Sequence, residues 1–198
     1  KKLQDAGRVY EDDGAWRFRF DRSKPVTFHD MICGDITIDY RDASNTPDMA
    51  IRRADGSYIF HFVNVVDDIE MKMTHVIRGE DHIMNTPKHI QLFEAFGVTP
   101  PVFAHMPLIL NQDGSKMSKR DVGAALGTYP EEGFLPEGVM NFLALLGWSP
   151  KGELAEQEIF TLPELVKAFD ITGISKSPAI FDRAKLDHFN AVYLRSMS

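Results

Sequence analysis

The sequence predicts an α/β fold in which a parallel sheet lies between a strand-rich segment and a helical one. Three observations carry this prediction. Apolar and polar residues alternate in residues 1–47, apolar runs bounded by turns occupy residues 48–120, and apolar residues at helical spacing follow in residues 121–198. We therefore expect three parts with these boundaries.

The first part reads as a small β-rich or mixed unit. Residues 16–20 (WRFRF) alternate apolar and basic side chains, and residues 36–40 (ITIDY) repeat the alternation. This pattern is typical of half-buried strands. Loops rich in Asp, Gly, Ser and Pro separate the two segments.

The second part carries a strand–helix–strand unit. Residues 58–66 are nearly all apolar, which suits a strand buried on both faces of a parallel sheet. A short strand over residues 75–78 precedes a helix that Thr86 caps and Gly97 ends. Residues 102–110 then return as a strand, so we expect a βαβ unit.

The third part is predicted to be helical. Apolar residues at helical spacing indicate a helix over residues 136–146, which Gly147 ends. Further helices are expected over residues 162–169 and 182–194, joined by short loops that contain Pro and Gly.

Composition and charge narrow the function classes. The apolar fraction of 43% and the charged fraction of 26% are ordinary for soluble proteins, and no apolar run approaches the ~20 residues that span a bilayer. We expect a cytoplasmic protein with no membrane segment. Cys33 is the single cysteine and no Cys/His cluster has zinc spacing, so no metal site is expected. The net charge of −7 argues against a protein that coats nucleic acid through overall positive charge, but a local basic face can still bind RNA.

The loop over residues 113–120 (DGSKMSKR) is the segment best suited to chemistry. Asp-Gly favours a turn, and Lys116, Lys119 and Arg120 then place three cations around the hydroxyl of Ser118. Cations at the carboxyl end of a strand can neutralise the phosphates of a nucleotide. The spacing is not that of a Walker A loop, and the alternative is a solvated basic turn.

The loop and its neighbours resemble one family. Lys-Met-Ser-Lys-Arg is similar to the KMSKS-type signature of class I aminoacyl-tRNA synthetases. Further segments occur in the order expected of bacterial-type glutamyl-tRNA synthetases: VIRGEDH (76–82), NTP (85–87), HMPLIL (105–110), EGFLP (132–136) and NFLALLGWS (141–149). The similarity extends from about residue 18 to the end of the chain.

The resemblance implies an architecture. Residues 1–47 would end an acceptor-binding insertion, residues 48–120 would form the second half of a Rossmann-type catalytic domain, and residues 121–198 would form a helical stem-contact domain. The His-x-Gly-His motif of class I enzymes, which precedes this region in relatives, does not occur in the sequence. We therefore expect a fragment of a longer enzyme that is inactive on its own.

The resemblance also implies a reaction. L-glutamate would be joined to tRNA(Glu) at the expense of ATP, through a glutamyl-adenylate. Mg²⁺ would accompany ATP, and the enzyme would be a monomer. Whether it charges one tRNA or also the tRNA for glutamine depends on anticodon-reading residues outside this sequence.

The glutamate-binding residues implied by the resemblance are Arg78, Asn64 and Phe60. Arg78 would bind the side-chain carboxylate of glutamate, as a guanidinium can do with two hydrogen bonds. The alternative for Arg78 is a structural ion pair with Glu80 or Asp81.

Asn64 would lie beside the amino acid, and its alternative is a core amide with satisfied hydrogen bonds. Phe60 stands where many relatives have Tyr, so only a packing role is expected of it. One hydrogen bond to the substrate is then either absent or supplied by Tyr58 or His61.

The ATP-binding residues implied by the resemblance come from three segments. Asp81 and His82 would lie near the nucleotide, and the backbone of Ile109 would face adenine. In the loop, Lys116, Met117, Ser118, Lys119 and Arg120 would bind ATP. Lys119 would stabilise the transition state, with Lys116 and Ser118 also catalytic.

Two rival hypotheses remain open. A glutaminyl-tRNA synthetase relative would continue into a β-barrel, whereas the helices expected after residue 146 favour the glutamyl type. A catalytically inactive synthetase-like module that binds RNA or protein is the second rival, and the intact loop over residues 116–120 argues against it.

Overall fold

The computed structural model describes residues 1–44, 46–118 and 125–197. Lys119 and Arg120 lie outside these described residues. The chain forms two compact units, Lys1–His105 and Met106–Ser198, and each is described by itself. In the described part of the chain, every helix is too short or too polar to cross a bilayer.

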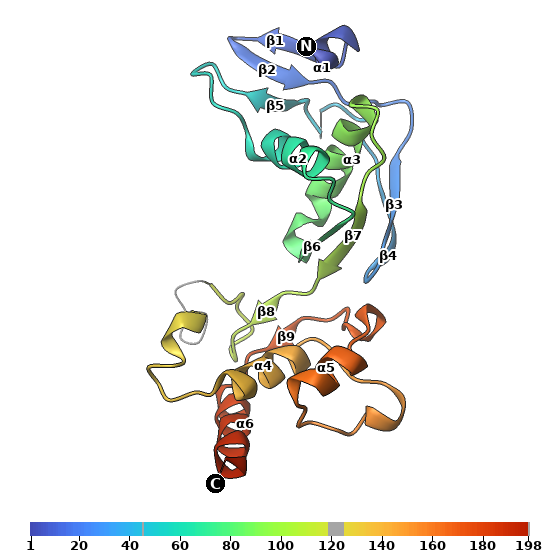
Figure 1. Cartoon of the computed structure of the whole chain (residues 1–198). Coiled ribbons are helices and arrows are strands. Elements are labelled where there is room, and N and C mark those ends of the chain that lie inside the picture. Colours follow the sequence, from blue (N-terminus) through green and yellow to red (C-terminus); the bar gives the residue numbers. More distant parts are fainter. Residues whose placement is uncertain (45, 119–124, 198) are drawn as a thin grey trace. The chain divides into compact units, whose positions relative to one another are not determined.

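A three-stranded antiparallel sheet forms one layer of the first unit (Figure 1). Strand β2 (Ala15–Phe18) lies between β1 (Val9–Asp12) and β5 (Met49–Arg52), and the short helix α1 (Lys2–Asp5) precedes β1. The two residues between β1 and β2 both have positive φ, as a tight hairpin turn requires. The strand predicted around residues 16–20 is confirmed.

A four-stranded mixed sheet forms the second layer, in the order β4-β3-β7-β6. Its strands are β3 (Val26–Asp30), β4 (Gly34–Ile38), β6 (His75–Gly79) and β7 (Val102–Met106). Strand β3 pairs antiparallel with β4 and parallel with β7, where Asp30 is opposite Phe103. Asp30, the last residue of β3, therefore lies beside β7, opposite a residue that precedes His105 by two positions.

The connection from β6 to β7 confirms the predicted strand–helix–strand order. A 3₁₀ helix, η1 (Glu80–Asn85), leads into α3 (Thr86–Ala95). The prediction that Thr86 caps α3 is wrong by one residue, because Asn85 is the N-cap and Thr86 is the first helical residue, fully buried. Gly97 ends the helix with φ of +67°, a backbone conformation that glycine adopts easily.

The prediction of a strand over residues 58–66 is wrong. The segment forms helix α2 (Phe60–Glu70), which contacts α3. Short apolar runs do not distinguish a buried strand from a buried helix. Phe62, Val65 and Ile69 are spaced by three and four residues, and all three pack into the core of the unit, so tertiary packing selects the helix.

One apolar core joins the three-stranded sheet to α2 and α3. Its buried members are Leu3, Phe18, Phe20, Tyr40, Ile51, Val65, Leu92 and Phe93. A smaller cluster of Phe28, Ile90 and Phe103 lies between the four-stranded sheet and α3.

The second unit begins with a two-stranded parallel sheet of β8 (Ile109–Leu110) and β9 (Ala179–Ile180). The strand predicted over residues 102–110 is thus split, since β7 ends at Met106 before Pro107, which cannot donate a ladder hydrogen bond. The strand directly before the cationic loop is not buried, since Ile109 is exposed.

The three helices predicted for the third part are confirmed as α4 (Pro136–Leu145), α5 (Leu162–Ala168) and α6 (Arg183–Ser196). Short 3₁₀ helices accompany them: η2 (Leu126–Thr128), η3 (Gly152–Leu154) and η4 (Ile171–Gly173). Side-chain caps begin two of the α-helices, Thr161 in a capping box with Glu164 and Asp182 at α6. Helix α4 contacts both α5 and α6.

Candidate active site

A buried polar cluster surrounds Arg78, which lies near the end of β6. Its Nε donates to His105 Nε2 (3.1 Å), and Nη2 donates to Thr86 Oγ1 (2.7 Å) and to the carbonyl of His82 (3.4 Å). Nη1 donates to His89 Nδ1 (3.3 Å). These acceptors are uncharged when the imidazoles are neutral. They engage four of the five N–H donors of the guanidinium.

His105 connects Arg78 to Asp30. The Asp30 Oδ2 atom lies 2.6 Å from His105 Nδ1, and both side chains are 0% exposed. Asp30 Oδ1 accepts three backbone N–H groups, from Ile32 (3.0 Å), Cys33 (2.8 Å) and His105 (3.2 Å). An acceptor surrounded only by donors is held as the carboxylate.

Burial and hydrogen bonding both act on the pKa values of this pair. Burial alone would raise the pKa of Asp30, but hydrogen bonds from Cys33 and His105 hold it below the usual value. Burial lowers the pKa of His105, which outweighs the opposing effect of Asp30. The pair is therefore a carboxylate and a neutral imidazole near neutral pH.

A second imidazole pair lies on the Nη1 side of Arg78. His89, on α3 and 1% exposed, accepts from Arg78 at Nδ1 and contacts His61 Nδ1 through Nε2 (3.0 Å). Burial, followed by the charge of Arg78, lowers the pKa of His89 to about 3. Burial also lowers the pKa of His61. Both rings are therefore neutral, and Nε2–H of His89 donates to His61.

Phe60 and Asn64 lie four residues apart on α2 and so share one face of the helix. This corrects their predicted placement on a strand. Phe60 is 57% exposed, and its ring centroid lies 5.5 Å from that of His61 and 6.2 Å from that of His82. Asn64 is partly buried. The structure therefore brings Phe60 to the edge of the Arg78 cluster.

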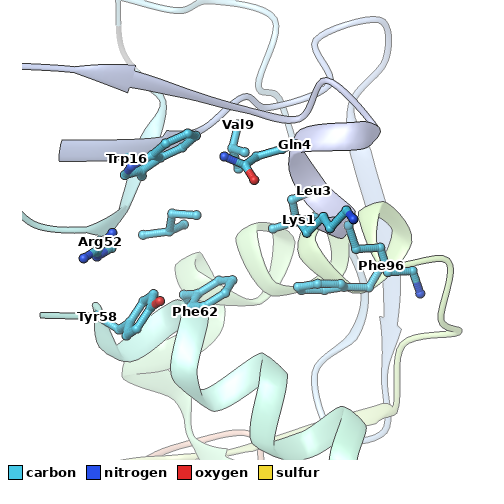
Figure 2. A pocket seen from close by; sticks show the side chains of 11 residues that line it. Lys1, Leu3, Gln4, Val9, Trp16, Arg52, Tyr58, Phe62 and Phe96 are labelled. Atoms are coloured by element: carbon cyan, nitrogen blue, oxygen red, sulfur yellow. The ribbon is translucent and has the colours of Figure 1, made fainter. Parts of the chain in front are cut away.

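Tyr58 belongs to a different cavity of the first unit, of about 250 Å³ (Figure 2). Its ring stacks on Phe62 with centroids 5.5 Å apart, and Arg52 lies 5.9 Å from its centroid. Tyr58 thus packs beside β5, whereas His61 joins the Arg78 cluster through His89. Of the two side chains expected to replace a tyrosine hydroxyl, only His61 contacts that cluster among the described residues.

Asp81 and His82 occupy the first turn of η1, directly after β6. The His82 carbonyl accepts from Arg78 and Thr86, while its ring Nδ1 lies 3.3 Å from Asn85 Nδ2. Asp81 is exposed, and its Oδ1 atom would lie 2.6 Å from a Cβ at Gly79. Glycine at position 79 therefore leaves room for the carboxylate to fold back over the chain.

The cationic loop of the second unit begins as a tight hairpin after β8. Gly114 N donates to Asn111 O (2.9 Å), Ser115 N donates to Asp113 Oδ1 (2.9 Å), and Gly114 has φ of +82°. Met117 N returns to Ile109 O (2.9 Å). The predicted Asp-Gly turn is confirmed, and it directs the chain back along β8.

The described part of the loop lines a cavity of about 350 Å³ within the second unit. Lys116, Met117 and Ser118 form one wall, and Ile109 and Phe181 are also among the lining residues. Lys116 and Ser118 are exposed, while Met117 packs on the apolar core of the unit. The predicted ATP-binding residues Ile109, Lys116, Met117 and Ser118 therefore share one cavity, and the predictions for Lys119 and Arg120 fall outside the described residues.

Four members of the Arg78 cluster had no expected role in binding or catalysis: Asp30, Thr86, His89 and His105. Two of them lie in family-like motifs, Thr86 in residues 85–87 and His105 in residues 105–110, but nothing in the sequence links His105 to Asp30, 75 residues earlier. Within the described residues, no group of three or more His, Cys, Asp or Glu side chains is arranged to hold a metal ion.

Comparisons with known proteins agree on one kind of protein. The family described as tRNA synthetases class I (E and Q), catalytic domain, matches residues 4–188. A glutamate–tRNA ligase of Akkermansia muciniphila is 82% identical over 194 residues, which cover 98% of this chain and 44% of that protein. One of Methylacidiphilum infernorum is 53% identical, with 96% and 41% covered.

A solved structure matches the fold. The glutamate tRNA ligase from Elizabethkingia meningosepticum, in complex with its amino acid, superposes with a TM-score of 0.81 at 35% identity. The match covers all of this chain and 41% of that one. The chain thus spans less than half the length of the relatives it matches.

Proposed function

Since the chain belongs to the catalytic-domain family of the class I tRNA synthetases for glutamate and glutamine, we propose that it supplies part of the active site of an enzyme that joins L-glutamate to tRNA(Glu). In the first step, an oxygen of the glutamate α-carboxylate attacks the α-phosphorus of ATP and pyrophosphate leaves. In the second, a hydroxyl of the terminal ribose of tRNA attacks the glutamyl carbonyl and AMP leaves.

The observation that supports this function best is the arrangement around Arg78. Four of its N–H groups are held by neutral acceptors, which leaves one N–H on Nη1 with no acceptor among the described residues. A guanidinium cannot be deprotonated under ordinary conditions, so it offers a fixed charge and a directed donor to a carboxylate. Phe60 and Asn64, on one face of α2, are the proposed neighbours of the same glutamate.

The loop after β8 is the proposed phosphate-binding element. Lys116 and Ser118 line the cavity of the second unit, and Lys116 offers an ammonium group that can offset charge on the leaving pyrophosphate. Lys119 has the proposed main role in transition-state stabilisation, with Lys116 supporting it, and Arg120 is proposed to bind ATP. Asp81, His82 and Ile109 are the other residues proposed to bind ATP, with Mg²⁺ bound to ATP as part of the substrate.

The proposal extends to the architecture and setting of the whole enzyme. Residues 1–47 end an acceptor-binding insertion, residues 48–120 belong to the catalytic domain, and residues 121–198 contact the tRNA stem. The enzyme acts as a monomer in the cytoplasm. A glutamine-specific enzyme is the second candidate, because the matched family includes both amino acids.

The test uses the full-length protein that contains this chain, in a tRNA-dependent pyrophosphate exchange assay. Arg78→Lys keeps the charge but loses the planar fork, so the KM for glutamate should rise by about 10- to 100-fold, as expected from the loss of charged hydrogen bonds. The KM for ATP should stay within about twofold. Arg41→Lys, at an exposed arginine paired with Asp39 (2.7 Å), is the matched control.

Three outcomes would count against the proposal. An unchanged KM for glutamate in Arg78→Lys would remove Arg78 from the amino-acid site. Efficient exchange with L-glutamine in place of L-glutamate would favour the second candidate. Undetectable exchange by the wild-type full-length protein with tRNA present would favour an inactive synthetase-like module.

A further inference from the structure

The Arg78 cluster contains a carboxylate, Asp30, that is connected to Arg78 through the imidazole of His105. We propose that Asp30 and His105 are positioning residues for Arg78: the Asp30 carboxylate fixes the Nδ1–H tautomer of His105, which leaves the Nε2 lone pair to accept from the guanidinium. This inference rests on the proposed function of Arg78 as the ligand of the glutamate side chain.

The contacts of His105 with Asp30 and with Arg78 both select this tautomer. On one side, Nδ1 lies 2.6 Å from Asp30 Oδ2, and a carboxylate only accepts hydrogen bonds. On the other side, Nε2 lies 3.1 Å from Arg78 Nε, which only donates. A proton on Nε2 would place two donors against each other, at a site where both His105 and Asp30 are 0% exposed.

The hydroxyl of Thr86 lies beside the His105 imidazole and contacts the same edge of Arg78. Its Oγ1 accepts from Arg78 Nη2 (2.7 Å), and its single O–H can be donated either to His105 Nε2 (3.0 Å) or to the His82 carbonyl (3.2 Å). Nε and Nη2 thus face two neighbouring acceptors, the imidazole nitrogen and the hydroxyl oxygen. These two contacts fix the plane of the guanidinium, and the N–H of Nη1 that does not face His89 is left for a ligand.

Asp30 is itself held rigidly. Its Oδ1 atom accepts the backbone N–H groups of Ile32, Cys33 and His105, so the turn after β3 and the strand β7 both fix its position. The backbone of one turn and one strand thus orients the Asp30 carboxylate, the carboxylate orients the His105 imidazole, and the imidazole orients the guanidinium. A neutral imidazole also leaves the charge of Arg78 for the substrate, whereas a directly bound carboxylate would neutralise it.

The test replaces Asp30 with asparagine in the full-length protein. Asn can keep the oxygen that accepts the backbone N–H groups, but its NH₂ group then faces His105 Nδ1. The imidazole must move its proton to Nε2, as an amide in a carboxylate–imidazole pair forces the wrong tautomer without changing the geometry. The Nε2–H then points at Arg78.

Two measurements follow this change. In selectively ¹⁵N-histidine-labelled full-length protein, the His105 ring should show the Nδ1–H pattern in the wild type and the Nε2–H pattern in Asp30→Asn. The KM for glutamate in pyrophosphate exchange should rise about tenfold, which corresponds to about 1.4 kcal/mol, with the KM for ATP unchanged within about twofold. His105→Gln identifies the His105 signals.

A matched control exists on the neighbouring strand. Asp35 Oδ1 lies 2.7 Å from His29 Nδ1, but these side chains are 80% and 72% exposed. Asp35→Asn removes a carboxylate from the same kind of pair without touching Arg78, so the KM for glutamate should stay at the wild-type value. An equal rise in both variants would overturn the proposal.

The remaining outcomes separate this inference from the proposed function. An Nε2–H pattern in wild-type His105 would overturn the positioning role even if Asp30→Asn failed to fold. A tautomer change in Asp30→Asn with no change in the KM for glutamate would do the same, provided that Arg78→Lys raises that KM. If Arg78→Lys also leaves it unchanged, the proposed role of Arg78 is what has failed.

Discussion

Lowering the pH should weaken the first unit through His89, a buried imidazole that the fold keeps neutral. Its ring is 1% exposed and faces the guanidinium of Arg78 at 3.3 Å. The pKa of His89 is lowered to about 3 from 6.5 by burial and by that charge. Because the folded-state pKa of His89 lies below the unfolded one, the free energy of unfolding is highest above pH 6.5, and it falls as the pH drops toward 3.

The size of the loss follows from the pH interval. At pH 5, which is one and a half units below the unfolded-state pKa of 6.5, His89 is protonated in the unfolded state and neutral in the folded state. At about 1.36 kcal/mol per unit, His89 alone removes about 2 kcal/mol from the free energy of unfolding between pH 7.5 and pH 5. Ordinary carboxylates titrate below this interval, so they contribute little to the change.

Native-state hydrogen exchange of the α3 amides (residues 86–95) in the full-length protein measures this free energy. In His89→Gln, the loss of unfolding free energy between pH 7.5 and pH 5 should be smaller than in the wild type by about 2 kcal/mol. This difference does not depend on how the substitution changes the stability at pH 7.5. His75→Gln, at an exposed position of β6, is the matched control and should leave the pH dependence unchanged. Full wild-type pH dependence in His89→Gln would refute the reasoning.

Two further predictions concern the second unit, each measured by denaturant unfolding or hydrogen exchange of its helices. Gly173→Ala should destabilise it by about 1–3 kcal/mol, because the new Cβ would lie 2.5 Å from Trp148 Nε1, while Gly147→Ala meets no atom within 4 Å and should cost less than about 1 kcal/mol. Leu186→Ala, at a 0% exposed position of α6, should lower the free energy of unfolding by about 2–5 kcal/mol. Its control Leu194→Ala, at a 48% exposed position of the same helix, should lower it by less than about 1 kcal/mol. Equal effects of the two glycine substitutions, or of the two leucine substitutions, would contradict the packing argument.

Local signals in the sequence were sufficient for most elements. The helix α3 follows from Pro87 near its start and Gly97 after its end, and α4 from apolar spacing up to Gly147. The hairpin of the cationic loop follows from Asp113-Gly114, since few other residues tolerate the positive φ of Gly114. In each case the determinant lies within the element or next to it.

Helix α2 shows where local signals fail. Its sequence is rich in aromatic and β-branched residues, which favour strands, and its apolar run is compatible with either structure. The choice depends on whether the apolar face meets a sheet or another helix. Val65, 0% exposed in a core shared with Leu92 and Phe93 of α3, is buried because α2 packs as a helix against that neighbour.

By itself the sequence determined the family, the order of most helices and strands, and the candidate ligands Arg78 and Lys116, because these depend on motifs and on periodicity along the chain. Only the tertiary structure decided how Arg78 is held. Its acceptors come from β7, α3 and η1, and the carboxylate behind His105 comes from β3, 75 residues away. Hydrogen bonds between buried polar groups are set by strand pairing and burial, and no spacing along the chain encodes them.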